Sequence, residues 1–274
     1  MAIQSFLKVD KEDPDWSCSP IQYHGKQFKV IDANCLQIRE GTEDNMVLRL
    51  APTETEMLCK HLQVVGKEGS RLDLHIICDG NEHTQQVFLY HVAAEPDSIL
   101  NIGIFIKNGK LNKHIFECEI YDNSVVNIYG LAENNVGGSS EILAKVYHAG
   151  PGAESSQYIN CIAGKESRTV FQGHVKIPED SVDSYTQICN SSIIVEPTGQ
   201  AYSIPQMFID CGKSEVSQSC DVGEFDEGQL CYLQGRGVSL DDAKKMLITA
   251  HQDNILNLIQ YKDLQDEIKE FFQD

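Results

Sequence analysis

The chain has 274 residues, and its 22 Lys and Arg against 41 Asp and Glu give a formal net charge of −19. This length fits one large domain, or one domain with an appendage, and suffices to bury a hydrophobic core. Because affinity for phosphate comes from clustered Lys and Arg, so acidic a chain is not expected to bind nucleic acid or an anionic membrane surface.

Residues 1–20 are predicted to be a lead segment that lacks the features of an export signal. Charged side chains between Lys8 and Asp13 interrupt the apolar core that a secretory signal needs. Nowhere in the sequence do about 20 apolar residues follow one another, as a membrane-spanning helix requires. We therefore expect a cytoplasmic protein with no membrane partner.

The sequence contains ten cysteines. Without an export signal they predict free thiols in a reducing compartment, since disulfide frameworks belong mainly to secreted chains. No two of them stand as Cys-x-x-Cys, so the common zinc and ferredoxin-type motifs are missing. Free cysteine is often buried, and each of the ten is first of all a candidate for the core.

Residues 21–222 have the pattern of a body built from short strands. Runs such as Met46–Leu50, Gln86–Tyr90 and His114–Ile120 alternate apolar with polar residues and are rich in β-branched and aromatic side chains. That pattern is typical of half-buried strands. No stretch in this region keeps a 3.6-residue apolar period long enough for a helix. The sequence therefore predicts a mainly β domain of roughly 200 residues.

This strand pattern is compatible with more than one architecture. A propeller would repeat every 40–50 residues or so, and the sequence has no such repeat. A β-sandwich is compatible with the pattern. A β-solenoid is compatible as well, since its coils stack on one another and need only be loosely similar in sequence. Periodicity alone does not decide between these two folds.

After Asp221 the strand pattern ends, and residues 223–274 are predicted to form a helical appendage. Asp226–Gly235 suits a short helix that begins with acidic residues, which interact favourably with the helix dipole. Gly237 then provides a stop for this helix.

Two further helices are expected in the appendage. Ser239 with Asp242 three residues later resembles a capping box and predicts the start of the second helix. One apolar face of this helix would be formed by Ala243, Met246, Leu247, Ala250, Leu258 and Ile259. The third helix is expected over Asp263–Phe272, with Leu264, Ile268 and Phe271 on one side.

The stretch GEFDEGQLCYLQGRGVSLDDA, residues 223–243, resembles a C-terminal motif of the SufB/SufD family of iron–sulfur cluster assembly proteins. Cys231 stands where that motif usually has Phe. The matching residues are Glu227, Leu230, Tyr232, Leu233, Arg236, Gly237 and Ala243. Residues 168–187 and 187–209 resemble two further family stretches in the same order. The resemblance covers about residues 148–258, and on it the chain is similar to a short, divergent, SufD-like member.

The resemblance implies a right-handed parallel β-helix followed by C-terminal helices, which favours the solenoid. It also implies a role without catalysis. Family members pair through the β-helix, with themselves or with a SufB/SufD paralogue, and bind a SufC-like ABC ATPase through the C-terminal helices. In this chain the implied ATPase-binding residues are Leu230, Tyr232, Leu233, Arg236 and Gly237. The sequence has no Walker A motif, so we expect this chain to bind no nucleotide.

The resemblance further implies a transient iron–sulfur cluster, and here the sequence departs from the family. Thiolate and imidazole are the usual ligands of such clusters. Val216 and Gln218 stand where the SufD branch has a Cys and a His, and Gln cannot replace imidazole as a ligand. Only Cys189 matches a family cysteine linked to assembly, so it is the first candidate for a cluster or sulfur site. Cys211 and Cys220 are weaker candidates, and a buried structural thiol is the alternative interpretation of all three.

Three functions follow from these patterns. The first is a non-catalytic scaffold subunit of an iron–sulfur cluster assembly complex. The second is a structural or regulatory β-helix module that has lost cluster chemistry, which the divergent stretch over residues 216–219 supports. The third is a β-helix enzyme acting on acidic polysaccharides. The net charge of −19 argues against this third function, because an anionic substrate needs basic residues to hold it.

Overall fold

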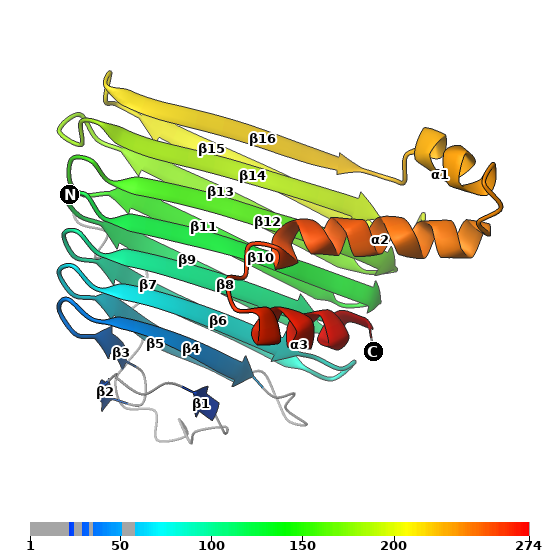
Figure 1. Ribbon diagram of the computed structural model, residues 1–274, viewed down its shortest axis with the longest axis horizontal. Coiled ribbons are helices and arrows are strands. Elements are labelled where there is room, and N and C mark those ends of the chain that lie inside the picture. Colours follow the sequence, from blue (N-terminus) through cyan, green and yellow to red (C-terminus); the bar gives the residue numbers. More distant parts are fainter. Residues whose placement is uncertain (1–21, 25–28, 33–34, 51–57, 274) are drawn as a thin grey trace.

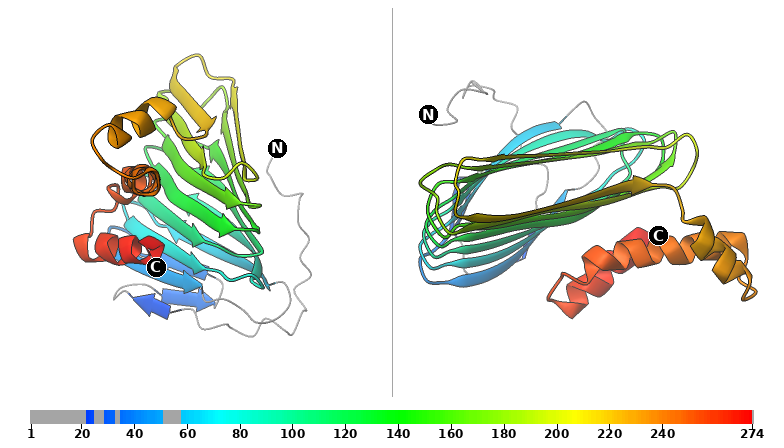
Figure 2. Two further views of the ribbon diagram at one scale, coloured as in Figure 1. Left: turned by 90° about the vertical axis from the view of Figure 1, so that its right-hand side faces the viewer. Right: turned by 90° about the horizontal axis from the view of Figure 1, so that it is seen from above.

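The computed structural model describes residues 22–24, 29–32, 35–50 and 58–273, so the predicted lead segment lies outside the described residues. The chain forms two eight-stranded sheets that lie face to face, and the last two of the three C-terminal helices cover part of one of them (Figure 1). Seen along the stack of strands, the two sheets enclose a flattened coil, with the helices outside it (Figure 2).

From the third strand onwards, successive strands alternate between two sheets, which are called the even and the odd sheet after the numbers of these strands. The even sheet contains β1 (Gln22–His24), β4 (Glu43–Leu50), β6 (Arg71–Asp79), β8 (Ile99–Lys107), β10 (Val125–Val136), β12 (Glu154–Lys165), β14 (Ser184–Ile194) and β16 (Ser214–Gly223). The odd sheet contains β2 (Lys29–Asp32), β3 (Cys35–Ile38), β5 (Leu58–Gly66), β7 (Gln85–Ala94), β9 (Leu111–Ile120), β11 (Ser139–His148), β13 (Arg168–Ile177) and β15 (Gln200–Ile209).

All strand pairings are parallel except those of β1 with β4 and of β2 with β3. One strand from each sheet therefore makes one coil, and the coils stack in register. This confirms the predicted parallel β-helix and rules out the sandwich, whose sheets are built from antiparallel strands.

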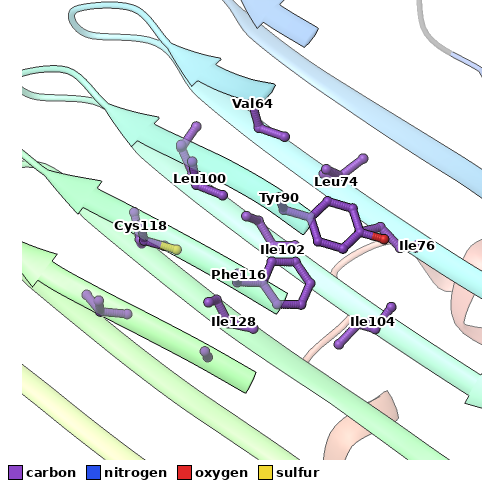
Figure 3. Close-up of a cluster of buried hydrophobic side chains, with 14 of the residues drawn as sticks. Val64, Leu74, Ile76, Tyr90, Leu100, Ile102, Ile104, Phe116, Cys118 and Ile128 are labelled. Atoms are coloured by element: carbon purple, nitrogen blue, oxygen red, sulfur yellow. The ribbon is translucent and has the colours of Figure 1, made fainter. Parts of the chain in front are cut away.

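The hydrophobic core lies between the two sheets. Every second side chain of β9 and β11 is buried, as expected for strands with one face on a core. Leu74, Ile102 and Ile128 occupy the same position on three successive even strands and form a row along the coil axis (Figure 3). From the odd sheet, the rings of Tyr90 and Phe116 stack at a centroid distance of 4.5 Å. Each such side chain stabilises the fold by about 1.5–3 kcal/mol through burial.

A repeated corner connects each odd strand to the next even strand. A residue with positive φ occurs at six successive corners, 26 to 31 residues apart: Gly41, Gly69, Asp97, Asn123, Gly152 and Asp183. The N–H of each donates to a carbonyl of the next corner, as from Asp97 to Asp122 and from Asn123 to Pro151, both at 2.9 Å. These residues are mostly Gly, Asn or Asp because only those types adopt the left-handed region at little cost. The corners therefore stack as regularly as the strands.

The C-terminal appendage consists of α1 (Glu227–Gln234), α2 (Leu240–Leu256) and α3 (Lys262–Gln273), close to the predicted bounds. Ser239 is the N-cap of α2, as predicted, and its Oγ accepts from the N–H of Asp242 at 3.1 Å. The C-terminal half of α2 and all of α3 pack on the outer face of the even sheet. The contact cluster contains Ile77, Phe105, Tyr129, Leu131, Ile162, Ile255, Leu256, Ile259, Leu264, Ile268 and Phe272.

The predicted apolar face of the second helix is right only in part. Ala243 is buried, but Met246 and Ala250 are exposed. α2 ends at Leu256, so Leu258 and Ile259 lie in the turn before α3, where only Ile259 is buried. The physical reason is visible in Figure 1: the N-terminal half of α2 projects past the sheet towards α1 and has no sheet to pack on.

Candidate functional site

Cys189 lies on β14 with its side chain on the outer face of the even sheet. Its register neighbours are Tyr158 of β12 and Ser219 of β16. The thiol is free and half-buried. Because Ile188 and Asn190 on either side of it are buried in the coil, alternation places Cys189 on the side where α2 and α3 pack.

Hydrogen bonds from two tyrosines converge on Gln187, which in turn contacts Cys189. Gln187 Nε2 donates to Cys189 Sγ at 3.2 Å, while Gln187 Oε1 accepts from Tyr158 Oη at 2.5 Å and from Tyr185 Oη at 3.0 Å. Burial, and to a lesser extent the neighbouring Cys189, raises the pKa of Tyr158, so its phenol stays protonated and donates. Bonds to an amide oxygen strengthen the amide N–H as a donor. The arrangement therefore places a polarised hydrogen-bond donor at the Cys189 sulfur.

Cys220 and Cys211 lie elsewhere. Cys220 pairs with Asn190, which points into the coil, so Cys220 is on the inner face of β16. It is exposed because no further coil covers β16. Cys211 is buried in the corner between β15 and β16 and belongs to the hydrophobic core. The structure therefore does not bring the three candidate cysteines together.

The described residues contain no group of side chains that resembles a metal site. Among them, no three His, Cys, Asp or Glu side chains are placed so that they could hold a metal ion. Val216 and Gln218, which stand at the family Cys and His positions, pair with buried residues and face the same side as Cys220. Within the described part of one chain, Cys189 and Cys220 are thus separate thiols, one on each face of the sheet.

A polar groove of about 360 Å³ lies beside Cys189, between the even sheet and the turn that joins α2 to α3. Its floor is a row of hydrogen bonds across four strands: Ser156 Oγ donates to Asn127 at 2.5 Å, Asn127 to Asn101 at 2.8 Å, and Asn101 to Asp73 at 2.5 Å. Tyr261, from the turn, donates to Asp73 at 3.0 Å. The bond from Tyr261 to Asp73 joins the turn between the helices to the sheet. The polar groups of the floor bond mainly to one another.

The predicted ATPase-binding residues lie on or just after α1, the least buried element of the appendage. None of the eight residues of α1 is fully buried, and Tyr232 is 60% exposed. Tyr232 and Leu233 line a shallow apolar depression of about 500 Å³, closed on one side by Leu247 of α2. Leu230 is half-buried, and Gly237 has a φ of +88°, which ends the helix as predicted. Tyr232 and Leu233 therefore share one exposed depression, whereas Leu230, two residues before Tyr232 on the helix, points to a different side.

The side chain of Arg236 contacts an aromatic ring rather than a carboxylate. Its guanidinium lies over the ring of Tyr232, 4.4 Å from the centroid, and it has no salt bridge to any described carboxylate. Stacking of this kind holds both side chains in place at the surface. Arg236 and Tyr232 thus present one rigid, amphipathic face next to the depression.

The C-terminal end of the β-helix is open. Val216 and Val222 of β16 face the coil interior but are exposed because no further coil covers them, and Tyr202, Ile204 and Phe208 are exposed on the outer face of β15. One edge of β16 has no neighbouring strand among the described residues. An uncovered edge of this kind is a template for pairing with another chain.

Sequence reasoning missed the groove residues Asp73, Asn101 and Asn127, and the buried charges of Lys107 and Glu133. Polar residues in strands read as solvent-facing when the position of the appendage is unknown. The signal in the sequence was their spacing. Asp73, Asn101 and Asn127 are separated by 28 and 26 residues, which is the length of one coil.

Fold and site together define a parallel β-helix with an open end and a helical appendage docked on one sheet. None of the described helices is long and apolar enough to cross a membrane. The family model "SUF system FeS cluster assembly, SufBD core domain" matches residues 22–251. The chain therefore belongs to the SufBD family of the iron–sulfur cluster assembly system.

Relatives of known name agree with this family. The chain is 22% identical over 211 residues to the iron–sulfur cluster assembly protein SufD of Escherichia coli, which covers 73% of this chain and 50% of SufD. It is 21% identical over 219 residues to a SufBD family protein of Mycobacterium tuberculosis, covering 76% of this chain and 55% of that protein. The chain thus spans about half the length of these relatives.

Proposed function

We propose that this protein is a non-catalytic scaffold subunit of a SUF-type iron–sulfur cluster assembly complex in the cytoplasm. In this role it binds a SufC-like ABC ATPase through α1 and the adjoining half of α2, and pairs through the open end of the β-helix. The observation that carries the proposal is the exposed apolar surface of α1, held away from the sheet by the projecting half of α2.

The surface around Tyr232 supports a protein partner rather than a small ligand. It is shallow, and it combines an exposed aromatic ring, a stacked Arg and apolar Leu side chains. Tyr and Arg are the residue types that contribute most to binding energy at protein interfaces. The nearby acidic residues Asp226, Glu227 and Asp242 complement a basic partner surface.

Pairing through the β-helix is supported by the open end. A second chain, identical or paralogous, would cover the exposed side chains of β15 and satisfy the free edge of β16. Cys220 lies on this strand, so it would lie in or next to such a contact. The eight described cysteines from Cys59 to Cys231 are free, which fits a reducing compartment.

The cluster, if this chain handles one, is cargo rather than a resident cofactor. Cys189 is the first candidate to accept sulfur or iron, since Gln187 donates to its sulfur. The second candidate function, a β-helix module without cluster chemistry, is favoured by the separation of Cys189 from Cys220 on opposite faces. Anaerobic reconstitution with iron and sulfide separates the two: uptake that Cys189→Ser abolishes supports the scaffold, and no uptake supports the module.

Co-purification tests the partner. The ABC ATPase subunit encoded by the same genome is expected to co-purify with the wild-type chain and not with Tyr232→Ala. Tyr202→Ala, a matched tyrosine on β15 that is also exposed, is expected to leave ATPase binding unchanged. If no complex forms with the wild-type chain, the proposed role as an ATPase-bound scaffold is wrong.

A further inference from the structure

Two charged residues are buried between the even sheet and the helices. Glu133 of β10 and Lys107 of β8 are register partners, and their exposures are only 5% and 8%. Both side chains lie on the outer face of the even sheet. Two positions before them on the same strands are Leu131 and Phe105, which belong to the cluster that α2 and α3 cover. The two charges therefore sit beneath the appendage and not in solvent.

Each of the two charges contacts a different helix. Gln252 Nε2 of α2 donates to Glu133 Oε2 at 2.7 Å, and Lys107 Nζ donates to the carbonyl oxygen of Phe271 in α3 at 2.7 Å. Lys107 Nζ also lies 5.6 Å from the centroid of the Phe271 ring. A cation is favoured there because the last turn of a helix carries partial negative charge. Burial raises the pKa of Glu133, against the opposing effects of Gln252 and Lys107.

Stability alone does not explain this pair. Burying two charges carries a desolvation penalty, and well-packed apolar residues of similar volume often give equal or greater stability. Apolar contacts are also non-directional, so a helix can shift on them, whereas a hydrogen bond has a preferred distance and angle. The Glu133 and Lys107 contacts therefore add orientation to a helix–sheet contact that the apolar cluster already holds together.

We propose that Glu133 and Lys107 are positioning residues that fix the angle of α2 and α3 on the even sheet. Through them, a displacement of α1 and the projecting half of α2 is passed to β8 and β10. This transmission of a displacement rests on the proposed function, because it requires a bound partner that displaces α1. The fixed angle itself is a property of the isolated chain and is tested there.

The test compares helix orientation with stability in the full chain. Spin labels attached to genetically encoded keto residues at Lys245 on α2 and Lys110 on the β-helix, both exposed, avoid the ten native cysteines. Their distance distribution is measured by pulsed electron paramagnetic resonance in the wild type and in the double variant Glu133→Leu/Lys107→Met. The control is Lys113→Met/Glu141→Leu, which removes an ion pair of 3.0 Å on the odd sheet, far from the helices.

In the Glu133→Leu/Lys107→Met variant we expect an unfolding midpoint equal to or above that of the wild type, a distance distribution at least about twice as wide, and amide exchange in α3 about tenfold faster. The control variant is expected to keep the wild-type width. A double variant with wild-type width and wild-type exchange would overturn the proposal.

If the double variant fails to fold, Gln252→Leu replaces it. This variant removes the donor that α2 offers to Glu133, and an unchanged width would again overturn the proposal. Failure of the chain to bind an ATPase would sink the proposed function but would leave these measurements on the isolated chain unaffected.

Discussion

Cys189 and Cys220 lie on the adjacent strands β14 and β16, one residue apart in register and on opposite faces of the even sheet. Cys189 pairs with Ser219, and Cys220 pairs with Asn190. Because successive side chains of a strand point to opposite faces, the sheet itself separates the two thiols. A site that used Cys220 would therefore draw its other groups from across the open end of the β-helix.

The environments of the cysteines lead to different rates of alkylation. We expect Cys220 to react with N-ethylmaleimide at least about tenfold faster than Cys211, since Cys211 is buried in the core and must wait for local opening. Mass spectrometry of time points gives both rates. On pairing, Cys220 should become protected while Cys231 on α1 stays reactive. Equal rates for Cys220 and Cys211 would show that the open end is covered.

The hydrogen bond to Cys189 is expected to affect the reactivity of its thiol. Gln187→Leu removes the donor to Cys189 Sγ, so alkylation of Cys189 at pH 7 should slow by about threefold to tenfold. Gln200→Leu is the matched control, because Gln200 also accepts from a tyrosine two residues away, Tyr202, but has no hydrogen bond to a cysteine of the described residues. Both variants are expected to retain the fold, which circular dichroism checks. An unchanged rate in Gln187→Leu would mean that the contact has no chemical effect.

Buried histidines make the fold sensitive to acid. Burial lowers the pKa of His114 to about 3 and that of His75 and of His148 to about 4, against 6.5 for an unperturbed histidine. The unfolded chain therefore binds about three more protons near pH 5. The resulting stability is complete above about pH 6.5 and is lost as the pH falls towards the folded values. The free energy of unfolding should fall by about 4 kcal/mol per pH unit near pH 5.

One of these histidines can be removed without losing its hydrogen bond. His148→Gln can still bond Ser155, which lies 2.9 Å from His148 Nε2, and the pH slope should fall by about one third, or 1.4 kcal/mol per pH unit or so. His83→Gln, at an exposed position, is the matched control variant. Urea unfolding at several pH values gives the slopes, and the same slope in all three proteins would contradict the assignment.

The stacked corners depend on left-handed backbone conformations. Gly69 has a φ of +64°, and a Cβ there would meet only the backbone of Gly41 at 4.0 Å, so Gly69→Ala tests conformation without a clash. It should destabilise the protein by about 1–2 kcal/mol. Gly212→Ala is the control, because φ is not positive there and the surrounding space is open. That variant should change stability by no more than about 0.5 kcal/mol in the destabilising direction.

Much of the fold was predictable because local patterns agree with it. Alternating residues indicated strands such as β9, and the Ser239 cap and acidic first turn indicated the start of α2. The choice of a solenoid needed the family resemblance, since alternation is the same in a sandwich. The corner repeat at Gly69, Asp97 and Asn123 could have shown the coil, but it shares only two or three residues per coil and its spacing varies.

Other parts could not be predicted from local patterns. β16 has only Val216 and Val222 as larger apolar residues, and it is a strand because its backbone pairs with β14. Lys107 and Glu133 are buried because α2 and α3 fold back over them, a contact between residues more than 100 positions apart in the chain. The faces on which Cys189 and Cys220 lie follow from register, which the sequence does not fix for an isolated strand.

The most direct test of the proposed role is the affinity of the purified chain for the ABC ATPase subunit from the same genome, measured by isothermal titration calorimetry. We expect the double variant Tyr232→Ala/Leu233→Ala to bind at least about tenfold more weakly than the wild type, since exposed Tyr side chains often dominate such interfaces. Tyr202→Ala/Phe208→Ala, on the open end, should bind as the wild type does. Wild-type affinity in the first variant, or no binding by the wild-type chain, would contradict the account.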